Sequence, residues 1–536
     1  MNQELKEQFL KDIDIFENSI HAFKAGEIDR KTYKGVSGGF GSYAQREEGS
    51  MLRLRMAGGR LTKERLAFLA DGVKKHNIDL MKITTCQTIQ LHNLEPDSTV
   101  ELMKKALDVD IVTRGGGGDF PRNVMVSPLS GVEQGEYFDV LPYAEAVAEY
   151  LLTLVRTIHL PRKLKVAFSN SPANITHATF RDLGFVARED GTFDVYCAGG
   201  LGPNAKIGVK VVEAVEPKNV IACVDAMISV FTTFGDYEHR GRSRTRYMQD
   251  SLGADKIKEE FNKALNEKLA TSKKVVVDTT KTDKLLTGKM TNVKNQADNN
   301  TEGANVSVTS TVLELNDVRV IPQKQSGLYA VSYHPIGGRL PVDMPEKLLQ
   351  LIQDMDAVEC RLSPDGTLYI INLTSDEAKA VLSITDDGAK TPFEHSVSCI
   401  GASICQQGIR DSQALLAEMV KAIRNAGIPA NALPRVCISG CASSCGTQQI
   451  GTLGFQGSAK IIDMQPHSAF LLLFNGNQNQ GEEKLGESMG TILQEQIPEF
   501  IVELGQMVAD SGLDFEQWIG EHEDQFRELA DKYINL

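Results

Sequence analysis

Apolar and polar residues follow two periods along the chain, and the changes of period mark the expected elements. Alternation predicts strands, and spacing of three to four residues predicts helices. The first run of elements is strand 51–56, helix 63–77, strand 82–91 and helix 98–107. The second run repeats that order as strand 328–333, helix 345–355, strand 360–371 and helix 376–382. Strand, helix, strand, helix is half of a split β-α-β unit, so the pattern predicts an α+β fold.

The two runs share residues at a fixed distance along the chain. Gly-Gly-Arg-Leu occurs at 58–61 and again at 337–340, 279 residues later, and Asn-Leu recurs at the same distance at 93–94 and 372–373. A repeat at one fixed distance predicts two pseudo-twofold-related halves packed together. The copies differ where chemistry is expected, because Arg53 and Arg55 of the first copy correspond to Ser332 and His334 of the second.

This repeat divides the chain into six expected segments. Residues 279–311 are rich in Thr, Asn, Lys and Ser and are expected to be a linker. The segments are an N-terminal helical extension (1–45), a ferredoxin-like half-domain (46–112), a larger α/β domain (113–278), the linker (279–311), a second half-domain (312–386) and a second larger domain (387–536).

The charge balance limits the expected partners and compartment. There are 57 Lys and Arg against 71 Asp and Glu, for a net charge of −14, which disfavours a general nucleic-acid binder. No apolar run approaches the roughly 18 residues that a membrane span requires. The charged N-terminus has no signal-peptide core. A cytoplasmic protein without a nucleic-acid or membrane partner is expected, and its cysteines are expected to be thiols or metal ligands.

Five of the nine cysteines lie within one short region. Cys399 and Cys405 form C-x5-C, and Cys441 and Cys445 form C-x3-C among glycines and serines. Four convergent thiolates suit a zinc ion or an iron–sulfur cluster, and C-x5-C is wider than the usual zinc spacing. Cys437 is also three residues before Cys441, so spacing alone leaves the ligand set open, and inert buried cysteines are a further alternative.

Basic residues gather in three groups despite the acidic composition. Arg53 and Arg55 share one face of a predicted strand, and Lys163 and Lys165 share a face in the stretch that follows Arg162. The third group alternates through Arg240, Arg242, Arg244 and Arg246. Because buried cations require compensation, these groups predict a polyanionic cofactor or a small oxyanion, although any one of them could be a solvated surface. Glycine-rich turns at 199–208 and 476–486 are expected to be equivalent and to allow close approach of the backbone to a ligand.

Several motifs together resemble the siroheme and [4Fe–4S] family of nitrite and sulfite reductases. The family pattern of C-x5-C followed by G-C-P-x-x-C-G is met by Cys399, Cys405 and residues 440–446, with Ala442 in place of proline. The family's M-L-R-x-R-x-x-G-G is met at 51–59, its R-N-V at 122–124 and its L-P-R-K-x-K at 160–165. The resemblance covers nearly the whole chain outside the linker.

The resemblance implies a role for each matching residue. It implies that Cys399, Cys405, Cys441 and Cys445 hold a [4Fe–4S] cluster, with Cys445 also the axial ligand of the siroheme iron. It implies that Arg53, Arg122, Lys163 and Lys165 bind the substrate anion on the other side of the siroheme. The residues that it assigns to the siroheme carboxylates are Arg55, Lys82, Gln87, Gln90, Arg162, Arg240, Arg242 and Arg244.

One position departs from the family pattern. The family commonly reads T-x-R-Q, with the arginine near the siroheme, where this chain has Thr84-Thr85-Cys86-Gln87. A cysteine cannot replace a guanidinium, so either another cation compensates or the cofactor site is altered.

The function that the resemblance implies is a six-electron reductase. Lys165 resembles the sulfite reductases, because plant-type nitrite reductases tend to have asparagine there, so sulfite to sulfide is expected and nitrite to ammonia is the alternative. The chain shows no flavin or ferredoxin domain, which implies a separate donor, either a ferredoxin or a flavoprotein subunit. Two other classes stay open: a non-enzymatic siroheme-binding or iron–sulfur protein, favoured by Cys86, and a zinc-stabilised structural protein.

Overall fold

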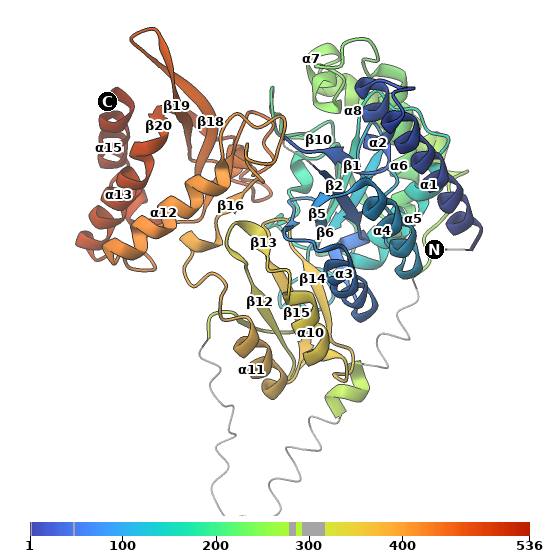
Figure 1. The fold of residues 1–536 in the computed structure, drawn as a ribbon, viewed down its shortest axis with the longest axis horizontal. Coiled ribbons are helices and arrows are strands. Elements are labelled where there is room, and N and C mark those ends of the chain that lie inside the picture. The colour runs from blue at the N-terminus through green and yellow to red at the C-terminus, as the bar shows by residue number, and fades with distance from the viewer. Residues whose placement is uncertain (2, 47–48, 278–285, 292–316) are drawn as a thin grey trace, which may run out of the picture.

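A computed structural model describes residues 1, 3–46, 49–277, 286–291 and 317–536. The described residues form four five-stranded sheets with helices packed on them (Figure 1). Two smaller sheets belong to the predicted half-domains, and two larger sheets belong to the domains that follow them. The fold is therefore α+β and is built from two related halves.

The first half begins with two helices and then forms the first half-domain and the first large sheet. The helices are α1 (Gln3–Lys24), α2 (Arg30–Gly39), α3 (Lys63–His76), α4 (Pro96–Ala106), α5 (Leu141–Leu154), α6 (Val220–Phe234), α7 (Met248–Ser251) and α8 (Ala254–Leu269). The half-domain strands are β1 (Ser42–Ala44), β2 (Ser50–Arg55), β3 (Arg60–Leu61), β4 (Met81–Ile83) and β5 (Thr88–Leu94). The strands of the first large sheet are β6 (Pro121–Val126), β7 (Leu164–Ser169), β8 (Leu183–Ala187), β9 (Phe193–Cys197) and β10 (Val209–Val215).

The second half repeats this plan. Its half-domain strands are β11 (Val320–Pro322), β12 (Tyr329–Tyr333), β13 (Arg339–Leu340), β14 (Glu359–Leu362) and β15 (Leu368–Leu373). Its large sheet contains β16 (Val397–Ser398), β17 (Val436–Ser439), β18 (Leu453–Ile462), β19 (Gln465–Phe474) and β20 (Glu487–Leu493). Its helices are α10 (Met344–Ile352), α11 (Ser375–Ile384), α12 (Ser412–Ala426), α13 (Ile497–Ser511), α14 (Phe515–Glu521) and α15 (Glu523–Asn535).

The two half-domains exchange a strand, and the repeated Gly-Gly-Arg-Leu makes the exchange. β13 of the second half pairs with β4 of the first, and β3 of the first half pairs with β14 of the second. In each copy both glycines have positive φ, at 58° and 66° for Gly58 and Gly59 and at 65° and 70° for Gly337 and Gly338. Side chains other than glycine rarely adopt this conformation, which explains why the motif occurs twice.

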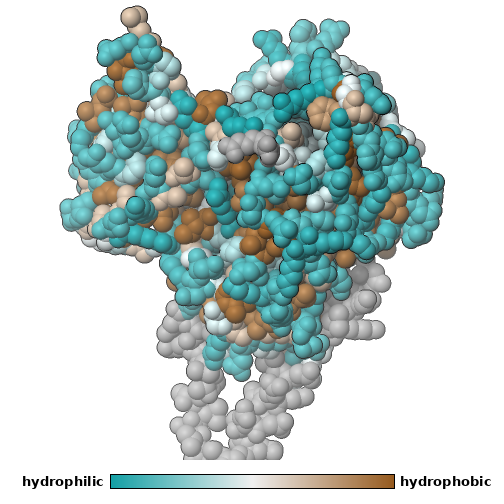
Figure 2. Space-filling model, viewed as in Figure 1, coloured by the Kyte–Doolittle hydropathy of each residue, from teal (hydrophilic) through white to brown (hydrophobic). Residues whose placement is uncertain are grey.

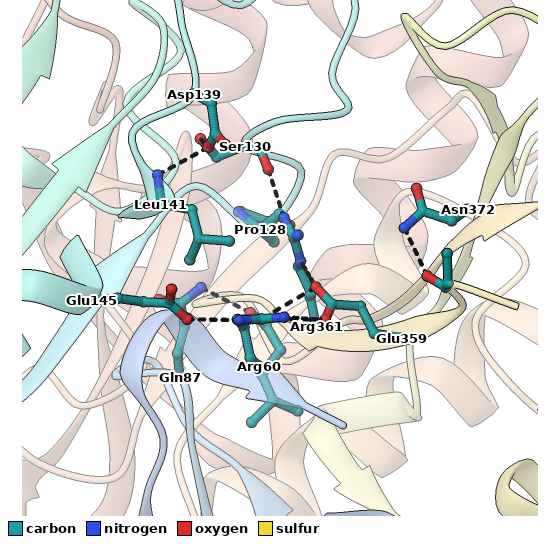
Figure 3. A network of polar contacts seen from close by, with 12 residues as sticks. Arg60, Gln87, Pro128, Ser130, Asp139, Leu141, Glu145, Glu359, Arg361 and Asn372 are labelled. Carbon is teal, nitrogen blue, oxygen red and sulfur yellow. Dashed lines mark hydrogen bonds and ion pairs between the residues drawn. The ribbon is translucent and has the colours of Figure 1, made fainter. Parts of the chain in front are cut away.

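Ion pairs fix the exchanged strand β3 against the second half (Figure 3). Arg60 lies between Glu359 of β14, at 2.7 Å, and Glu145 of α5, at 2.8 Å. Arg361 binds the other oxygen of Glu359 at 2.6 Å and also donates to the Ser130 carbonyl. Consequently one buried carboxylate joins an arginine from each half.

Each long strand predicted for the second strand position is in fact a hairpin. The segment expected at 82–91 divides into β4 and β5 around a turn at 84–87, and the segment expected at 360–371 divides into β14 and β15. The first turn closes with Thr84 N–H donating to the Thr88 carbonyl, and Gln87 has a φ of 51°. This correction matters because it places Cys86 at the tip of a hairpin instead of inside a strand.

The two large sheets have the same strand order and the same directions. In both, the first two neighbouring pairs are parallel and the next two are antiparallel. The loop 440–452, which we name the cysteine loop, corresponds to the counterpart loop 170–182 of the first half. Both loops lead into Leu-Gly-Phe, at 183–185 and 453–455, and Asn174 and His177 have positive φ as Ser444 and Thr447 do.

The core is shared between the halves at the half-domains. One apolar cluster runs from Phe16 of α1 through Leu54 of β2 to Val331 and Leu362 of the second half-domain. The large sheets have their own cores, one under α5, α6 and α8 and the other under α12, α13 and α15. The pseudo-twofold centre therefore has a continuous core, so the two halves form one unit.

The expected linker at 279–311 lies mostly outside the described residues. The described residues 286–291 form a short helix, and Lys289 there binds Glu377 of α11 at 2.7 Å. This segment thus differs from the expectation of a structureless linker, because its lysine finds a carboxylate at the start of α11.

Candidate active site

A cavity of about 1230 Å³ lies where the two halves meet, and residues from both halves line it. The hairpin tip of the first half contacts the cysteine loop, because Thr85 Oγ1 donates to the Cys445 carbonyl at 3.0 Å. Arg46 of the first half binds the carbonyl of Gly408 at 2.6 Å in the loop that carries Cys405. On the outside, the molecule is mostly hydrophilic and is hollowed between its N- and C-terminal lobes (Figure 2).

Arginines on one wall are held by backbone carbonyls. Arg53 on β2 donates to the Gly116 carbonyl at 2.6 Å, and Arg122 on β6 donates to the carbonyls of Gly116 and Gly118, both at 2.8 Å. Arg55 donates to the Arg122 carbonyl at 3.0 Å. Burial lowers the pKa of Arg55 to about 9 and that of Arg122 to about 10. Desolvation of the charged form causes these shifts, and neighbouring arginines add to them.

Lysines complete this cationic wall. Lys163 and Lys165 flank Leu164 at the start of β7 and both line the cavity. Burial lowers the pKa of Lys163 well below its usual value. The side chain of Lys82 on β4 is buried, its ammonium donates to the Gly337 carbonyl, and burial lowers its pKa to about 7. Buried lysines of this kind favour an anionic ligand, because a nearby negative charge raises the pKa of the ammonium group back toward its usual value.

Few carboxylates pair with the cations of the cavity. Asp119 pairs with Arg162 at 2.5 Å and Arg240 at 2.7 Å, and Asp182 pairs with Arg244 at 3.0 Å. Among the described residues, the other buried or half-buried cations of the cavity have no carboxylate partner. These are Arg53, Arg55, Lys82, Arg122, Lys163, Lys165 and Arg181. So many unpaired cations around one cavity fit a ligand with several anionic groups.

Four cysteines also line the cavity. They are Cys399, Cys405, Cys441 and Cys445, whereas Cys437 lies buried in β17 and does not line it. Burial, together with nearby Cys399, raises the pKa of Cys445 to about 12. All nine cysteines are free thiols. Within the described ranges, no three His, Cys, Asp or Glu side chains form a group that could hold one metal ion.

Glycines let the cysteine loop fold tightly behind these thiols. A Cβ on Gly446 would lie 2.0 Å from the Ile438 carbonyl, and one on Gly440 would lie 2.3 Å from the Arg410 carbonyl. The Gly440 N–H donates to Cys399 Sγ at 3.2 Å. The loop therefore offers a backbone donor to sulfur, a contact that stabilises a thiolate.

The structure brings most of the predicted site residues to this cavity but not all of them. Gln87 is fully buried away from the cavity, where its side chain bonds Val126 and the Leu362 carbonyl (Figure 3). Arg242 lines a separate hollow of about 540 Å³. The segment 240–246 is a series of turns instead of an alternating strand, so its arginines diverge. The predicted residues that do line the cavity are Arg53, Arg55, Lys82, Gln90, Arg122, Arg162, Lys163, Lys165, Arg240, Arg244 and the four cysteines.

Sequence reasoning missed Arg181 and the environment of Cys86. Burial alone would raise the pKa of the Cys86 thiol, but Lys165, Arg181 and Arg53 lower it to about 6. Arg181 lies near the end of the counterpart loop and lines the cavity while only 5% exposed. The repeated Leu-Gly-Phe, 270 residues apart, is the signal that could have drawn attention to this loop.

The comparisons with known proteins agree with this geometry. The family "Nitrite and sulphite reductase 4Fe-4S domain" matches residues 117–269, and "Nitrite/Sulfite reductase ferredoxin-like half domain" matches 43–109 and 321–387. The chain belongs to the nitrite and sulfite reductase family. It is thus an oxidoreductase whose cofactors are siroheme and a [4Fe–4S] cluster.

The relatives include both nitrite reductases and sulfite reductases. A ferredoxin–nitrite reductase of Synechococcus elongatus is 25% identical over 85% of each chain. Sulfite reductase [ferredoxin] 1 of Mycolicibacterium paratuberculosis is 22% identical over 80% of this chain and 77% of that one. The structure of Mycobacterium tuberculosis NirA superposes with a TM-score of 0.75 at 22% identity, covering 97% of both chains, and shows that the fold is shared.

The residues of the cavity fit the cofactors of this family. Siroheme carries many carboxylates, and the seven unpaired cations supply partners that no protein carboxylate satisfies. The four cavity-lining thiols supply a ligand set for the cluster at one wall of the same cavity. In the part of the chain that the structure describes, no helix is long and apolar enough to cross a membrane.

Proposed function

We propose that this reductase converts sulfite to sulfide in a six-electron reaction. The observation that favours sulfite is the number of unpaired cations, above all Lys165, at the anion side of the cavity. Sulfite carries up to two negative charges near neutral pH and nitrite carries one, so a stronger positive field favours sulfite. Nitrite to ammonia is the alternative reaction of the same site.

In this proposal the four cavity cysteines would hold the cluster, and Cys445 would also be the cysteine that contacts the siroheme. Siroheme and the cluster supply the iron that binds the anion and the electrons that reduce it. The proposal divides the chain into the six segments expected from the sequence. The first half contributes the cations of the site, and the second half contributes its cysteines.

The cations Arg53, Arg122, Lys163 and Lys165 bind and orient the anion. The two arginines present fixed guanidinium groups, because backbone carbonyls hold them. The lysines also supply protons as oxygen leaves as water. Burial lowers the pKa of Lys163; nearby Cys86 raises the pKa of Lys165, but burial and the neighbouring arginines lower it overall. An adjacent anion raises it again, so anion binding draws protons into the site at the lysine ammonium groups.

The remaining cavity cations bind the siroheme carboxylates. These are Arg55, Lys82, Arg162, Arg240 and Arg244, with Gln90 as a neutral donor. Arg162 and Arg240 share Asp119, so each retains part of its charge for a ligand. Electrons come from a separate donor, a ferredoxin or a flavoprotein subunit; the name of one relative gives ferredoxin as the donor, and that of another gives NADPH.

The deciding experiment compares both anions under the same conditions. Purified protein with reduced viologen as donor is expected to show a higher kcat/KM for sulfite than for nitrite. Lys165→Asn is expected to lower the sulfite value about tenfold or more relative to nitrite, since a charge-assisted hydrogen bond contributes about 1.5–3 kcal/mol. Lys460→Asn is the control, because this lysine bonds the Ile534 carbonyl far from the cavity lining. A higher kcat/KM for nitrite in the unmodified protein would overturn the sulfite assignment.

The donor is tested separately. Reduced ferredoxin and an NADPH-dependent flavoprotein are each supplied with the enzyme and sulfite, and the rates are compared with that of the viologen. Turnover with neither protein donor, despite turnover with viologen, contradicts the donor proposal alone.

A further inference from the structure

Arg181 is a buried cavity cation to which neither motif nor spacing gave a role. It lies near the end of the counterpart loop, its side chain lines the cavity, and it is 5% exposed. Its nearest carboxylate, Asp182, is already engaged by Arg244 and Thr245 and by the backbone N–H of Lys165. The Cys86 thiol is the other acidic group that acts on this arginine, and among the described residues neither it nor Asp182 hydrogen-bonds the guanidinium, so the buried cation favours a further anionic ligand.

The guanidinium of Arg181 is fixed on one edge only. Its Nε donates to the Thr176 carbonyl at 3.0 Å, and its Nη2 lies 3.3 Å from His177 Nδ1. Among the described residues, Nη1 has no hydrogen-bond partner. One edge of the planar fork is therefore held by the protein, and a donor remains for a ligand in the cavity.

His177 is a positioning residue for Arg181, and its tautomer follows from its partners. Arginine only donates, so Nδ1 of His177 must be the acceptor, and the proton must be on Nε2. Nε2 then donates to Gln478 Oε1 at 3.0 Å. Burial lowers the pKa of His177 well below its usual value, which keeps the ring neutral, as this arrangement requires. Gln478 comes from the second half, so both halves set the position of Arg181.

Cys86, at the tip of the hairpin, lines the same cavity as Arg181 and packs against the apolar cluster that contains Ala178 of the counterpart loop. At this tip the first half offers a thiol, which brings no positive charge. Arg181 places a guanidinium beside the same point from a different element, the end of the counterpart loop. The geometry therefore places a cation where the hairpin itself supplies none.

We propose that Arg181 binds a carboxylate of the siroheme and replaces the cation that position 86 lacks. The fork of arginine matches a carboxylate, and a cofactor with many carboxylates requires more cations than the assigned ones. This inference rests on siroheme being the ligand of the cavity. It assigns the end of the counterpart loop, which holds no cysteine, to binding the cofactor.

The test measures siroheme binding instead of turnover. Cofactor-free protein, made in a host that lacks siroheme, is titrated with siroheme, and the Soret absorbance gives the dissociation constant. Arg181→Gln is expected to weaken binding about tenfold or more, as loss of one charge-assisted pair predicts. Arg188→Gln is the matched control, since Arg188 lies at the end of β8 and pairs on the surface with Asp190 and Asp194. It should bind as the unmodified protein does.

A second substitution separates charge from folding. Cys86→Arg in the Arg181→Gln background returns a guanidinium to the same region, and it is expected to recover binding to within about threefold. Arg181→Lys keeps the charge without the fork and should lie between the unmodified protein and Arg181→Gln. If Arg181→Gln proves unfolded by circular dichroism, the Arg181→Lys titration alone decides, and unchanged binding there counts against the proposal.

The other results of the siroheme titration show which assignment fails. Unchanged siroheme binding in a folded Arg181→Gln protein overturns the proposal. Unchanged siroheme binding with a raised KM for sulfite also overturns it and assigns Arg181 to the substrate. If the unmodified protein itself binds no siroheme, the cofactor assignment fails before Arg181 is tested.

Discussion

Glu359 should stabilise the contact between the two halves more than any exposed ion pair does. It lies 14% exposed between Arg60 and Arg361, which come from different halves. Burial would raise the pKa of this carboxyl, but the two arginines lower it from 4.5 to about 2. At about 1.4 kcal/mol per tenfold change in proton affinity, this lowering corresponds to about 3 kcal/mol of stabilisation. The stabilisation is complete above pH 4.5 and is lost as the pH falls through about 2.

Glu359→Gln at pH 7 should therefore cost about 3 kcal/mol, which agrees with the usual cost of removing one partner of a buried pair. The matched control is Glu145→Gln, which removes the other, 38%-exposed partner of Arg60 and should cost less than about 1 kcal/mol. Amide hydrogen exchange in peptides covering β3 is the assay, because among the described strands β3 pairs only with β14 of the other half, whereas β14 also pairs with β15 of its own half. Exchange should accelerate about 100-fold in Glu359→Gln and less than about fivefold in the control.

Two outcomes would refute this reasoning. An acceleration of less than about tenfold in Glu359→Gln would mean that the carboxylate gains little from its two arginines. Equal effects of the two substitutions would mean that burial does not distinguish the pairs. The fluorescence of Trp518, buried in the C-terminal domain, monitors that domain separately and should be unchanged in both variants.

The remaining predictions concern the cavity. Cys445→Ser should abolish cluster incorporation, measured as iron per chain, whereas Cys437→Ser should retain it because Cys437 does not line the cavity. Gly446→Ala should also reduce the iron content strongly, since its methyl group would meet the Ile438 carbonyl, and normal iron would contradict the tight loop. In cofactor-free protein, alkylation of Cys86 by iodoacetamide should rise through a pH of about 6, and a midpoint near 8.5 would show that the cations do not act on it. Lys163→Gln should raise the KM for the anion about tenfold or more while the visible spectrum stays unchanged, and an unchanged KM would remove it from the anion site.

Much of the fold could be predicted because its signals are local. The Gly-Gly-Arg-Leu repeat and the alternation around Arg53 and Arg55 gave the two half-domains and the face that the arginines share. The turn at 84–87 was missed because Thr-Thr-Cys-Gln contains none of the glycine, proline or asparagine that usually mark a hairpin turn. The strand exchange was also missed, since a two-residue strand leaves no periodic pattern.

Site residues that belong to a sequence motif could be predicted, whereas those whose position depends on the packing of the folded chain could not. Spacing left Cys437 as an alternative, and the family motif named in advance the four cysteines that line the cavity. Gln87 fitted a motif, yet its amide satisfies backbone groups of both halves away from the cavity. Arg242 looked equivalent to Arg240 and Arg244, but in a series of turns, spacing of two does not define a face. Arg181 stands alone in the sequence, and only the folded loop gives it neighbours.

The exchange of β3 and β13 has a consequence for the origin of the molecule. A half-length ancestor with the same Gly-Gly-Arg-Leu turn would complete its small sheet only with a strand from a second copy, so it would have been a dimer. Such a dimer would have had two identical loops at two identical cavities. Joining the copies into one chain let the loops diverge: one now carries Cys441 and Cys445, and the other has Ser171 and Ile175 in their places. The asymmetry of the catalytic centre is therefore a benefit of fusion that no symmetric dimer could obtain.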